Sequence, residues 1–281
     1  MQTALEHRDD APRQPRVVIV MPALNEEAAV GAQVRAAWAH PALRALPLAR
    51  VIVVDNGSDD ATTAVARAAG AEVVSEPTRG YGRACLAGVR AAHVGDIILQ
   101  MDADGSDDLA GAAQVARLAL AGGADLAMGS RVRGVVEPGA LTPQQRMGNA
   151  IATRLMRLLC GARVSDLGPV RAIRRETLLA LDMREMTYGW STEMLVKAAR
   201  AGLRIVESPV DYHRRAGGAS KVSGTLAGTV RAGWRILSAV LRYARWRPAA
   251  PIAAQHSNAS NISNISTSDP AAAVFTEGSR P

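Results

Sequence analysis

From residue 16 onward, short runs of apolar residues alternate with longer stretches in which apolar residues recur every three or four positions. The short runs are typical of buried strands, and the longer stretches are typical of helices that bury one face. The first half of the chain predicts strands over 17–21, 51–54, 71–75, 97–101 and 126–130, and helices over 25–38, 83–92 and 109–121. A further helix is expected to be capped by Ser58 or Asp59 and ended by Gly70. Continuous apolar strands separated by helices favour an α/β fold with a mainly parallel sheet covered on both faces.

The second half of the chain is less regular. It predicts helices over 143–160, 192–201 and 225–246, and short strands near 170–173 and 205–212. We expect four parts along the whole chain, which are a flexible arm over 1–15, one α/β domain over 16–223, a basic amphipathic helix over 224–247 and a tail over 248–281. The tail is rich in Ala, Ser, Asn and Pro, a composition that predicts disorder.

The composition narrows the classes of function. Aromatic residues make up 3% of the 281 residues, whereas a protein that stacks on nucleic-acid bases would carry more rings, so we expect no nucleic-acid partner. The two cysteines, Cys85 and Cys160, are too few for a disulfide framework or a cysteine zinc site, and they indicate a reducing cytoplasm. No apolar run approaches the ~20 residues that span a bilayer, so we expect a soluble or peripheral protein.

The formal charge of +7 is unevenly placed along the chain. Residues 1–199 carry 22 basic and 22 acidic side chains, whereas residues 200–247 carry ten basic and two acidic ones. The excess positive charge therefore lies in one C-terminal segment, which we interpret as a binding surface for phosphates on a substrate and on a membrane.

Acidic residues follow three of the predicted strands, in the segments 22–27, 55–60 and 102–108. Ligands of open parallel sheets bind beyond the carboxyl ends of the strands, so we expect these segments to meet at one site. Asp102 and Asp104 are the sharpest signal, because two carboxylates at i and i+2 can turn toward one hard cation, Mg²⁺ or Mn²⁺. The alternative is a polar turn in which Asp107 or Asp108 lies at the start of the next helix.

Two common nucleotide-binding classes are disfavoured. No Gly-Lys-Ser/Thr of a P-loop occurs. Gly80, Gly82 and Gly88 do not form the dinucleotide fingerprint, and they follow the third predicted strand rather than the first.

Several segments together resemble the inverting family 2 glycosyltransferases of GT-A fold. They cover about residues 16–223 and include VVDNGSDD at 53–60, MDADGSDD at 101–108, GSR at 129–131, DLGPVRAIRRE at 166–176 and RRAGGASK at 214–221. The closest branch is that of the dolichyl- or polyprenyl-phosphate mannosyl- and glucosyltransferases, whose pattern of Arg followed by Gly-x-Ser-Lys is matched by Arg215, Gly218, Ser220 and Lys221.

The resemblance implies a role for individual residues. The residues implied to bind the nucleotide sugar are Pro22, Ala23, Asn25, Glu26, Asp55, Gly80, Arg83, Asp102 and Ala103. Asp102 and Asp104 would hold the metal, and Arg131, Arg215 and Lys221 would hold the diphosphate or an acceptor phosphate. These cations suit the chemistry, because breaking a sugar–diphosphate bond develops negative charge on the leaving group.

The resemblance also has departures. Ser106 stands where the branch often carries Gln or His, which leaves a third protein ligand to the metal unassigned. A hydroxyl acceptor would need a general base, whereas a phosphate acceptor is already ionised. Asp166 and Glu193 are the carboxylates available in the second half, and we expect them to shape the acceptor side. Their alternatives are a turn residue and a surface acid at the start of a helix.

The last predicted helix is amphipathic. Leu226, Val230, Trp234, Leu237 and Leu241 share one face, and Arg231, Arg235, Arg242 and Arg245 form an adjacent stripe. Such a helix can lie on an anionic membrane, and the alternative is a helix that packs on its own domain.

The leading hypothesis is a metal-dependent inverting glycosyltransferase that moves a hexose from GDP-mannose or UDP-glucose to a polyprenyl phosphate at the cytoplasmic face of the membrane. A first alternative keeps the donor and uses a soluble phosphorylated or secondary metabolite as the acceptor. A second is a sugar-phosphate nucleotidyltransferase, although residues 22–27 lack the Gly-rich basic loop that it would need. A third is a non-enzymatic module that binds anionic lipid or nucleic acid, which would leave the acidic segments without a purpose.

Overall fold

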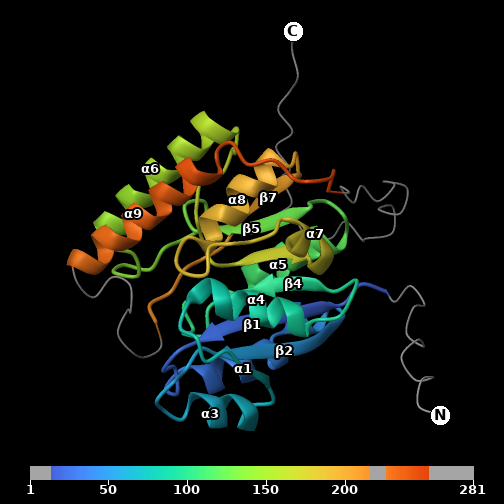
Figure 1. Ribbon diagram of the computed structural model, residues 1–281. Helices are drawn as coiled ribbons and strands as arrows, with labels where there is room; N and C mark the ends of the chain where they lie inside the picture. Colours follow the sequence, from blue (N-terminus) through green and yellow to red (C-terminus); the bar gives the residue numbers. More distant parts are fainter. Residues whose placement is uncertain (1–13, 216–225, 253–281) are drawn as a thin grey trace, which may run out of the picture.

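A computed structural model describes residues 14–215 and 226–252, with side chains of the last helix described from residue 233. The strands are β1 (Val17–Ala23), β2 (Leu48–Asp55), β3 (Glu72–Ser75), β4 (Ile97–Gln100), β5 (Leu126–Ser130), β6 (Arg171–Arg174) and β7 (Ile205–Pro209). The helices are α1 (Val30–Ala39), α2 (Pro41–Arg44), α3 (Thr62–Ala68), α4 (Tyr81–Ala91), α5 (Leu109–Leu120), α6 (Pro143–Cys160), α7 (Arg175–Ala180), α8 (Trp190–Arg200) and α9 (Leu226–Tyr243) (Figure 1).

The strands form one sheet in the order β3-β2-β1-β4-β6-β5-β7. β1 lies between β2 and β4 and is parallel to both, so the carboxyl ends of these three strands lie at the same edge. β6 runs antiparallel to its neighbours β4 and β5, which the sequence pattern did not predict. The expected α/β fold with a mainly parallel sheet is confirmed.

The core has a layer on each face of the sheet. Alternate residues of β1 enter opposite layers, with Val17, Ile19 and Met21 on one side and Val18 and Val20 on the other. This alternation follows from the two-residue period of a strand, and it explains why strands buried on both faces are apolar throughout. At Gly88 of α4, an added Cβ would lie 2.4 Å from Cγ1 of Val20, so the glycine allows α4 to pack close to the sheet.

The predicted helix boundaries agree best with the structure where capping signals are strong. α6 begins at a capping box in which Thr142 and Gln145 bond each other's backbone, and it ends at Gly161 with a left-handed φ of 71°, as expected. The helix expected from Asn25 begins only at Val30, because the preceding residues form a loop in which Asn25 itself has a φ of 50°.

The expected cap of α3 is wrong. Neither Ser58 nor Asp59 caps this helix, and its N-cap is Ala61 without a side-chain bond. The Ser58 hydroxyl instead accepts a hydrogen bond from the backbone N–H of Asn25 at 2.9 Å, and the N–H of Asp59 donates to Asn25 Oδ1 at 2.8 Å. The Ser58 hydroxyl thus joins the ends of β1 and β2, and the Asp59 carboxylate pairs with Arg79 at 2.9 Å, so neither side chain caps the helix.

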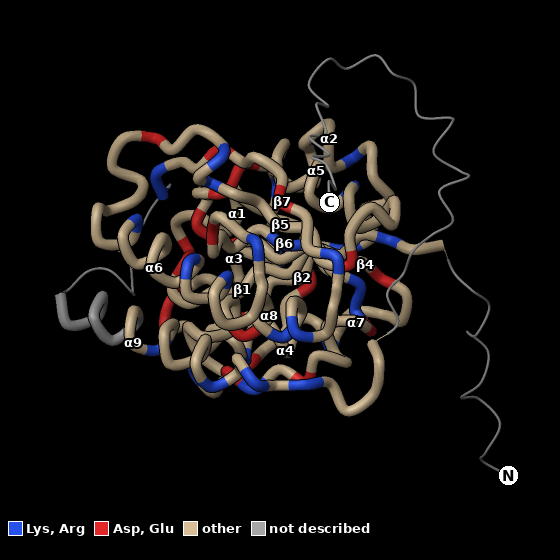
Figure 2. The backbone as a smooth tube through the Cα atoms, turned by 90° about the horizontal axis from the view of Figure 1, so that it is seen from above, with Lys and Arg blue, Asp and Glu red and all other residues tan. Residues whose placement is uncertain are grey.

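The short helices α2 and α7 were not predicted, and both lie outside the long periodic stretches. α6 and α9 lie side by side at one end of the molecule (Figures 1 and 2). No helix within 14–215 or 226–252 is long and apolar enough to cross a membrane. The expected arm over 1–15 and the tail over 248–281 lie almost wholly outside the described residues, and the four-part division of the chain stays a prediction.

Candidate active site

The ends of β1 and β2 form the first wall of the site. Besides the bonds between Asn25 and the Ser58–Asp59 turn, the N–H of Glu26 donates to Thr62 Oγ1 at 2.8 Å. Asp55, the last residue of β2, accepts from the N–H of Ser58 at 3.2 Å. Pro22 and Ala23 are the last residues of β1 and pair with Val54 and Asp55. The predicted nucleotide-binding residues of these two strands are therefore brought together.

The start of α4 adds its N-cap, Gly80, and Arg83 of its first turn to the same edge. Asn56, which follows β2, accepts from the N–H of Gly80 at 2.7 Å and donates to the carbonyls of Glu76 and Thr78. One buried amide side chain therefore fixes the loop that leads from β3 into α4.

Asp102 and Asp104 lie in the turn that follows β4. Asp104 is buried, and its Oδ1 accepts from both the N–H and the hydroxyl of Ser106, at 2.9 and 2.5 Å. Ser106, at the position where a third metal ligand was in doubt, thus turns its hydroxyl toward Asp104. Burial and the neighbouring charge of Asp104 raise the pKa of Asp102 to about 6, although the charges of Arg215 and Arg131 act in the opposite direction.

The two following acids have different roles. Asp108 caps α5, as expected, because its carboxylate accepts from the N–H groups of Ala110 and Gly111, both at 2.9 Å. Asp107 does not cap the helix. Its Oδ2 accepts from the backbone N–H of Asp102 at 2.7 Å, so it holds the turn that carries the two predicted metal ligands. Burial and the charge of Asp102 raise the pKa of Asp107 well above its ordinary value.

Arg215 reaches this turn from the segment that follows β7. Its Nη1 lies 3.0 Å from Oδ2 of Asp104, and the N–H of His213 donates to the carbonyl of Ser106 at 2.9 Å. The structure thus joins Arg215 and Asp104, which are 111 positions apart in the sequence. Lys221, Gly218 and Ser220 lie outside the described residues, and the predicted role of Lys221 stays a prediction.

Arg131 and Asp166 form a buried bidentate ion pair. Arg131 Nε and Nη2 lie 2.8 and 2.9 Å from the two oxygens of Asp166, and the backbone N–H of Arg131 donates to Oδ2. Burial alone would raise the pKa of Asp166, but the hydrogen bonds and charge of Arg131 outweigh it and hold this pKa below its ordinary value. Asp166 is therefore a poor proton acceptor, and its turn position was predicted without its partner.

The contacts of Glu193 lie away from the acidic edge of the sheet. It is fully buried, with Oε1 2.7 Å from Nζ of Lys197, and its oxygens accept from the N–H groups of Arg184 and Glu185. The alternative interpretation of Glu193 as a surface acid is thus wrong, because α8 turns this residue into the core rather than to solvent. A carboxylate held by an ammonium and two N–H groups is also poorly placed to act as a base.

Sequence reasoning missed three side chains around the site. The Tyr212 ring lies under the guanidinium of Arg131, 4.9 Å from its carbon, and the Tyr81 hydroxyl donates to Asp102 Oδ1 at 3.4 Å. Arg171 is fully buried and donates to the carbonyls of Gly168 and Ser191, so it supports the turn that carries Asp166. The available signal was that a chain with only four tyrosines places two of them beside the predicted motifs.

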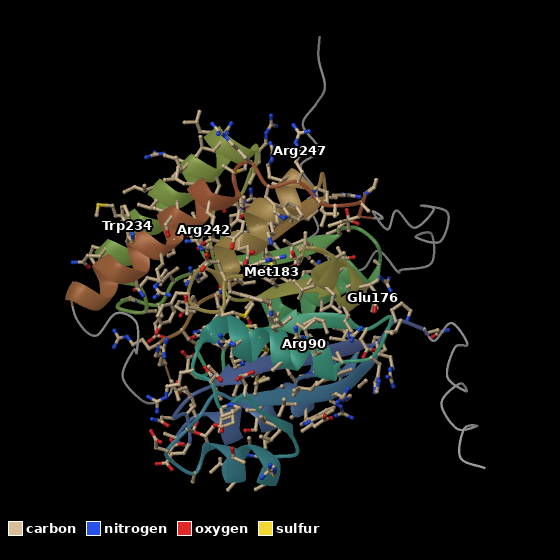
Figure 3. All side chains as sticks on the ribbon, in the orientation of Figure 1. Arg90, Glu176, Met183, Trp234, Arg242 and Arg247 are labelled. Atoms are coloured by element: carbon tan, nitrogen blue, oxygen red, sulfur yellow. The ribbon has the colours of Figure 1, made fainter. Side chains whose placement is uncertain are left out.

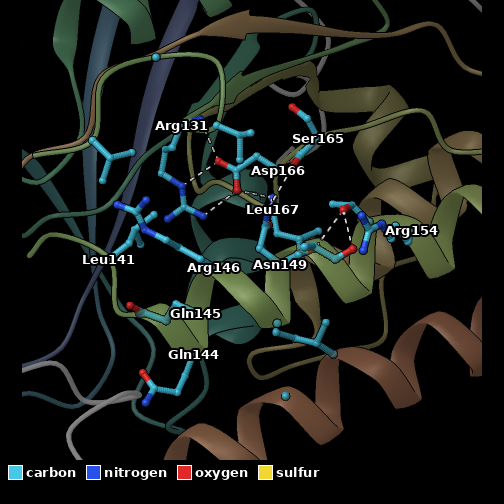
Figure 4. A pocket seen from close by; sticks show the side chains of 18 residues that line it. Arg131, Leu141, Gln144, Gln145, Arg146, Asn149, Arg154, Ser165, Asp166 and Leu167 are labelled. Atoms are coloured by element: carbon cyan, nitrogen blue, oxygen red, sulfur yellow. Dashed lines mark hydrogen bonds and ion pairs between the residues drawn. The ribbon is translucent and has the colours of Figure 1, made fainter. Parts of the chain in front are cut away.

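A cavity of about 800 Å³ extends from the Arg131–Asp166 pair to α9, between α6 and the loop after β5 (Figure 4). Its cationic and amide side chains come from Arg131 and from α6, and they are Arg131, Gln144, Gln145, Arg146, Asn149 and Arg154. Its apolar wall includes Val132, Val136, Leu141 and Ile236. The cavity can therefore hold an anionic group at one end and an apolar group along its wall.

Comparison with known proteins identifies the family. The model of the family described as "Glycosyl transferase family 2" matches residues 18–181, more than half of the chain. The chain belongs to glycosyl transferase family 2. This family 2 glycosyltransferase contains in the matched segment all three acidic strand ends and the Arg131–Asp166 pair.

Several relatives of this glycosyltransferase have curated names. It is 41% identical over 228 residues to a protein of Mycobacterium tuberculosis named an uncharacterized glycosyltransferase, covering 79% of this chain and 98% of the relative. It is 33% identical to the undecaprenyl-phosphate mannosyltransferase of Micrococcus luteus, covering 73% and 85%. It is 34% identical to the dolichyl-phosphate hexose transferase of Haloferax volcanii, covering 72% and 84%.

Solved structures share the fold. The glucosyl-3-phosphoglycerate synthase of Mycobacterium tuberculosis, crystallised with Mn²⁺ and UDP-glucose, aligns with a TM-score of 0.61 at 24% identity over 82% of this glycosyltransferase and 79% of the synthase. This level of identity supports the fold alone.

Proposed function

We propose that this glycosyltransferase moves a hexose, with inversion, from a nucleotide-diphosphate sugar such as GDP-mannose or UDP-glucose to a polyprenyl phosphate. The observation that carries the proposal is the position of Arg131. Its charge acts on Asp102 in the acidic turn, and its side chain lines the cavity that leads to α9. A donor at the sheet edge and an anionic acceptor in the cavity would therefore meet at Arg131.

A divalent cation fits the acidic turn. Asp102 and Asp104 offer carboxylate oxygens, which Mg²⁺ and Mn²⁺ prefer, and both ions commonly complete their coordination with substrate phosphates and water. The described residues contain no group of three or more His, Cys, Asp or Glu side chains that could hold a metal. Burial and, after it, the like charge of Asp104 raise the pKa of Asp102, and a bound cation would offset both effects. When bound, the cation would neutralise charge on the diphosphate.

The residues of this chain would divide the remaining work. Pro22, Ala23, Asn25, Glu26, Asp55, Gly80, Arg83, Asp102 and Ala103 are proposed to bind the nucleotide sugar. Arg215, which already contacts Asp104, would face the leaving diphosphate and stabilise its developing charge. Arg131 would orient the acceptor phosphate, one oxygen of which attacks the anomeric carbon as the bond to the diphosphate breaks.

A phosphate acceptor also agrees with the state of the two candidate bases. Asp166 has a lowered pKa and is bound by Arg131, and Glu193 is buried in a separate ion pair. Neither is placed to take a proton from a hydroxyl, whereas a phosphate oxygen is ionised at neutral pH and needs no base.

The experiment that tests the proposed function is a donor and acceptor panel with the purified chain. We expect released nucleotide and a glycosylated lipid when GDP-mannose or UDP-glucose is supplied with Mn²⁺ and a short-chain polyprenyl phosphate. Omission of the acceptor should leave only slow donor hydrolysis. Transfer to a soluble phosphorylated metabolite, with none to the polyprenyl phosphate, would contradict the lipid acceptor and support the same chemistry on a soluble one. Absence of turnover with every donor would contradict the function.

We further propose that α6 and α9 dock on an anionic membrane surface, at the cytoplasmic face. Exposed apolar side chains line both helices. Leu158 and Met147 of α6 are 79% and 61% exposed, and Leu241 of α9 is 61% exposed. Trp234 of α9 is 72% exposed and points away from the domain (Figure 3). Neither helix contains an acidic residue. Apolar side chains beside arginines fit the interface of a bilayer with anionic lipids. Self-association through this face would place like charges against each other.

The packing of α9 refines the sequence interpretation. Among the side chains described from residue 233 on, the buried ones are Ala239, Val240 and Tyr243, so this part of the helix packs by a face other than the one that carries Trp234 and Leu241. Arg235 and Arg242 donate to Thr187 and Glu185 of the domain, at 2.5 and 2.8 Å, and therefore contribute less to a free basic stripe than expected. One side of α9 therefore packs on its own domain, and the other side exposes apolar residues.

Membrane docking predicts a specific effect of the exposed side chains. We expect the wild-type chain to float with vesicles that contain an anionic phospholipid. The double variant Trp234→Glu/Leu241→Glu should bind these vesicles at least about tenfold more weakly, because it loses two apolar groups that docking would bury in the membrane and adds two negative charges. Substitution is preferable to deletion of 224–247, which would expose the core beneath α9.

The control is Val94→Glu, which changes a 74% exposed apolar residue in the loop before β4, away from both helices. It should float like the wild type. Equal flotation of the double variant and the control would remove the exposed face of α9 from the membrane interaction, and concentration-dependent dimers disrupted by the double variant would assign this face to a second copy of the chain.

A further inference from the structure

Lys197 is one of two lysines in the chain, and it is buried at a junction of three elements. Its Nζ lies 2.7 Å from Oε1 of Glu193 and donates to the carbonyl of Asp182 at 2.5 Å. The rings of Tyr243 and Trp246, at the end of α9, lie 4.9 and 5.0 Å from the same Nζ. The ammonium group is thus surrounded by α8, by the segment after α7 and by the end of α9.

The carboxylate of Glu193 extends this network to a backbone segment. Its two oxygens accept from the N–H of Arg184 at 2.9 Å, and Oε2 also accepts from the N–H of Glu185 at 2.6 Å. We call residues 182–187 the clamp segment. Its first residue, Asp182, is held by Lys197, and its third and fourth, Arg184 and Glu185, are held by Glu193, so one buried ion pair fixes its path.

The clamp segment lies against the turn that we assign to the nucleotide. The N–H of Arg83 donates to the carbonyl of Met186 at 3.2 Å. An added Cβ on Gly80 would lie 2.3 Å from that carbonyl oxygen, and one on Gly82 would lie 2.1 Å from the carbonyl oxygen of Glu185. The two backbones are in direct contact, and a shift of the clamp segment would therefore move the start of α4.

α9 holds the outer side of the clamp segment. Arg242 donates to Oε1 of Glu185 at 2.8 Å, and Arg235 donates to Thr187 Oγ1. The clamp segment is therefore enclosed between α8, α9 and the nucleotide-side turn, although none of its residues lies in the acidic turn after β4.

We propose that Lys197 and Glu193 are positioning residues for donor binding, because they hold the clamp segment that shapes the turn at Gly80–Arg83. This inference rests on the proposed function, which places the donor nucleotide at that turn. Burying a charged pair is rarely the most stabilising choice for a core, since an apolar pair of similar volume is often as stable or more so. The bonds from this pair to three backbone groups give it a geometric role that an apolar pair would not supply.

The test measures nucleotide binding by calorimetry with the whole chain, using UDP and GDP separately in the presence of Mn²⁺. We expect Lys197→Met to raise the dissociation constant of the bound nucleotide about tenfold, and the KM of the donor with it, while the KM of the acceptor is unchanged. A merely structural role would instead lower the melting temperature and the active fraction without changing nucleotide affinity. An unchanged nucleotide affinity in folded Lys197→Met would overturn the inference.

A surface variant keeps the test informative if Lys197→Met does not fold. Arg242→Ala removes the ion pair from α9 to Glu185, at a site where Arg242 is exposed, and we expect a weakening of nucleotide binding of about threefold. The matched control is Arg245→Ala. Arg245 is an exposed arginine just after α9 and outside the clamp segment, and this variant should bind nucleotide like the wild type.

A double-mutant cycle shows whether the two residues act together. Glu193→Gln should weaken nucleotide binding about as much as Lys197→Met, because an amide cannot accept from both N–H groups and the ammonium. The double variant should bind nucleotide no more weakly than the weaker-binding single variant does. Additive losses of nucleotide affinity would contradict the inference that both residues act through the clamp segment. Wild-type chain that binds neither nucleotide would overturn the proposed function and this inference with it, whereas wild-type binding that the variants leave intact would overturn the inference alone.

Discussion

Asp104→Asn is expected to lower the rate of sugar transfer by about a thousandfold or more, with the chain still folded. Asp104 is buried, contacts Arg215 and is one of the two carboxylates proposed to hold the metal. The amide preserves the size of the side chain and one oxygen that can accept from Ser106, but it removes the charge that a divalent cation requires. The measurement is nucleotide release from the donor in the presence of Mn²⁺, with and without the lipid acceptor.

Asp108→Asn is the matched control for this prediction. Asp108 lies four residues further along the same acidic segment, and its carboxylate caps α5, a role that asparagine also performs well. We expect transfer within about twofold of the wild-type rate. Comparable losses in both variants would indicate a general disturbance of the turn. Wild-type activity that persists after complete chelation of divalent cations would refute the metal assignment.

Asp166→Asn is expected to destabilise the chain by about 3–5 kcal/mol and to abolish most transfer, because it leaves the buried guanidinium of Arg131 without its counter-charge. The pair is bidentate, and Asp166 is almost fully buried. Arg131 would no longer be fixed at the start of the cavity. Urea unfolding gives the change in stability, and the KM of the acceptor against that of the donor separates loss of acceptor binding from general loss of activity.

The same pair predicts a pH dependence. Because the pKa of Asp166 is lowered in the folded chain, its charge stabilises the fold at pH values above the pKa of the unfolded chain. This stabilisation disappears as the pH falls through the folded-state pKa. The difference in unfolding free energy between wild type and Asp166→Asn should therefore shrink on acidification from neutral pH to about pH 3.

Asp182→Asn is the control for the ion pair. Asp182 forms an exposed pair with Arg184, and loss of such a pair costs less than about 1 kcal/mol. A cost of similar size for Asp166→Asn would mean that the Arg131–Asp166 pair contributes no more than a surface contact, and Arg131 would then need another explanation for its fixed position.

The two faces of α9 link the proposals to one another. Its outer face carries Trp234 and Leu241, and its inner side carries Tyr243 against Lys197. A variant of the outer face tests the membrane, and a variant of the inner network tests the donor site. Deleting the helix would disturb both at once, which is why single side chains are the informative changes.

The part of the fold that the sequence predicted is the part governed by local pattern. β1, β2 and β4 are buried on both faces, so their apolar runs are continuous, and their acidic ends follow at once in the sequence. α6 was predicted with its observed bounds, 143–160, because its periodic pattern and the glycine that ends it are local signals. The antiparallel direction of β6 has no such signal, since strand direction depends on how the chain returns to the sheet.

The sequence by itself determined the family, the sheet with helices on both faces, and the acidic edge with Asp102 and Asp104. Each of these rests on short segments whose pattern can be recognised locally in the chain. Only the tertiary structure decided how the charges are paired. It joined Asp166 to Arg131 and Arg215 to Asp104, and it buried Glu193 with Lys197 beneath α9. The physical reason is that the partner and the burial of a charged side chain are set by elements distant in sequence, and these decide whether a carboxylate can bind a cation, hold an arginine or support a backbone segment.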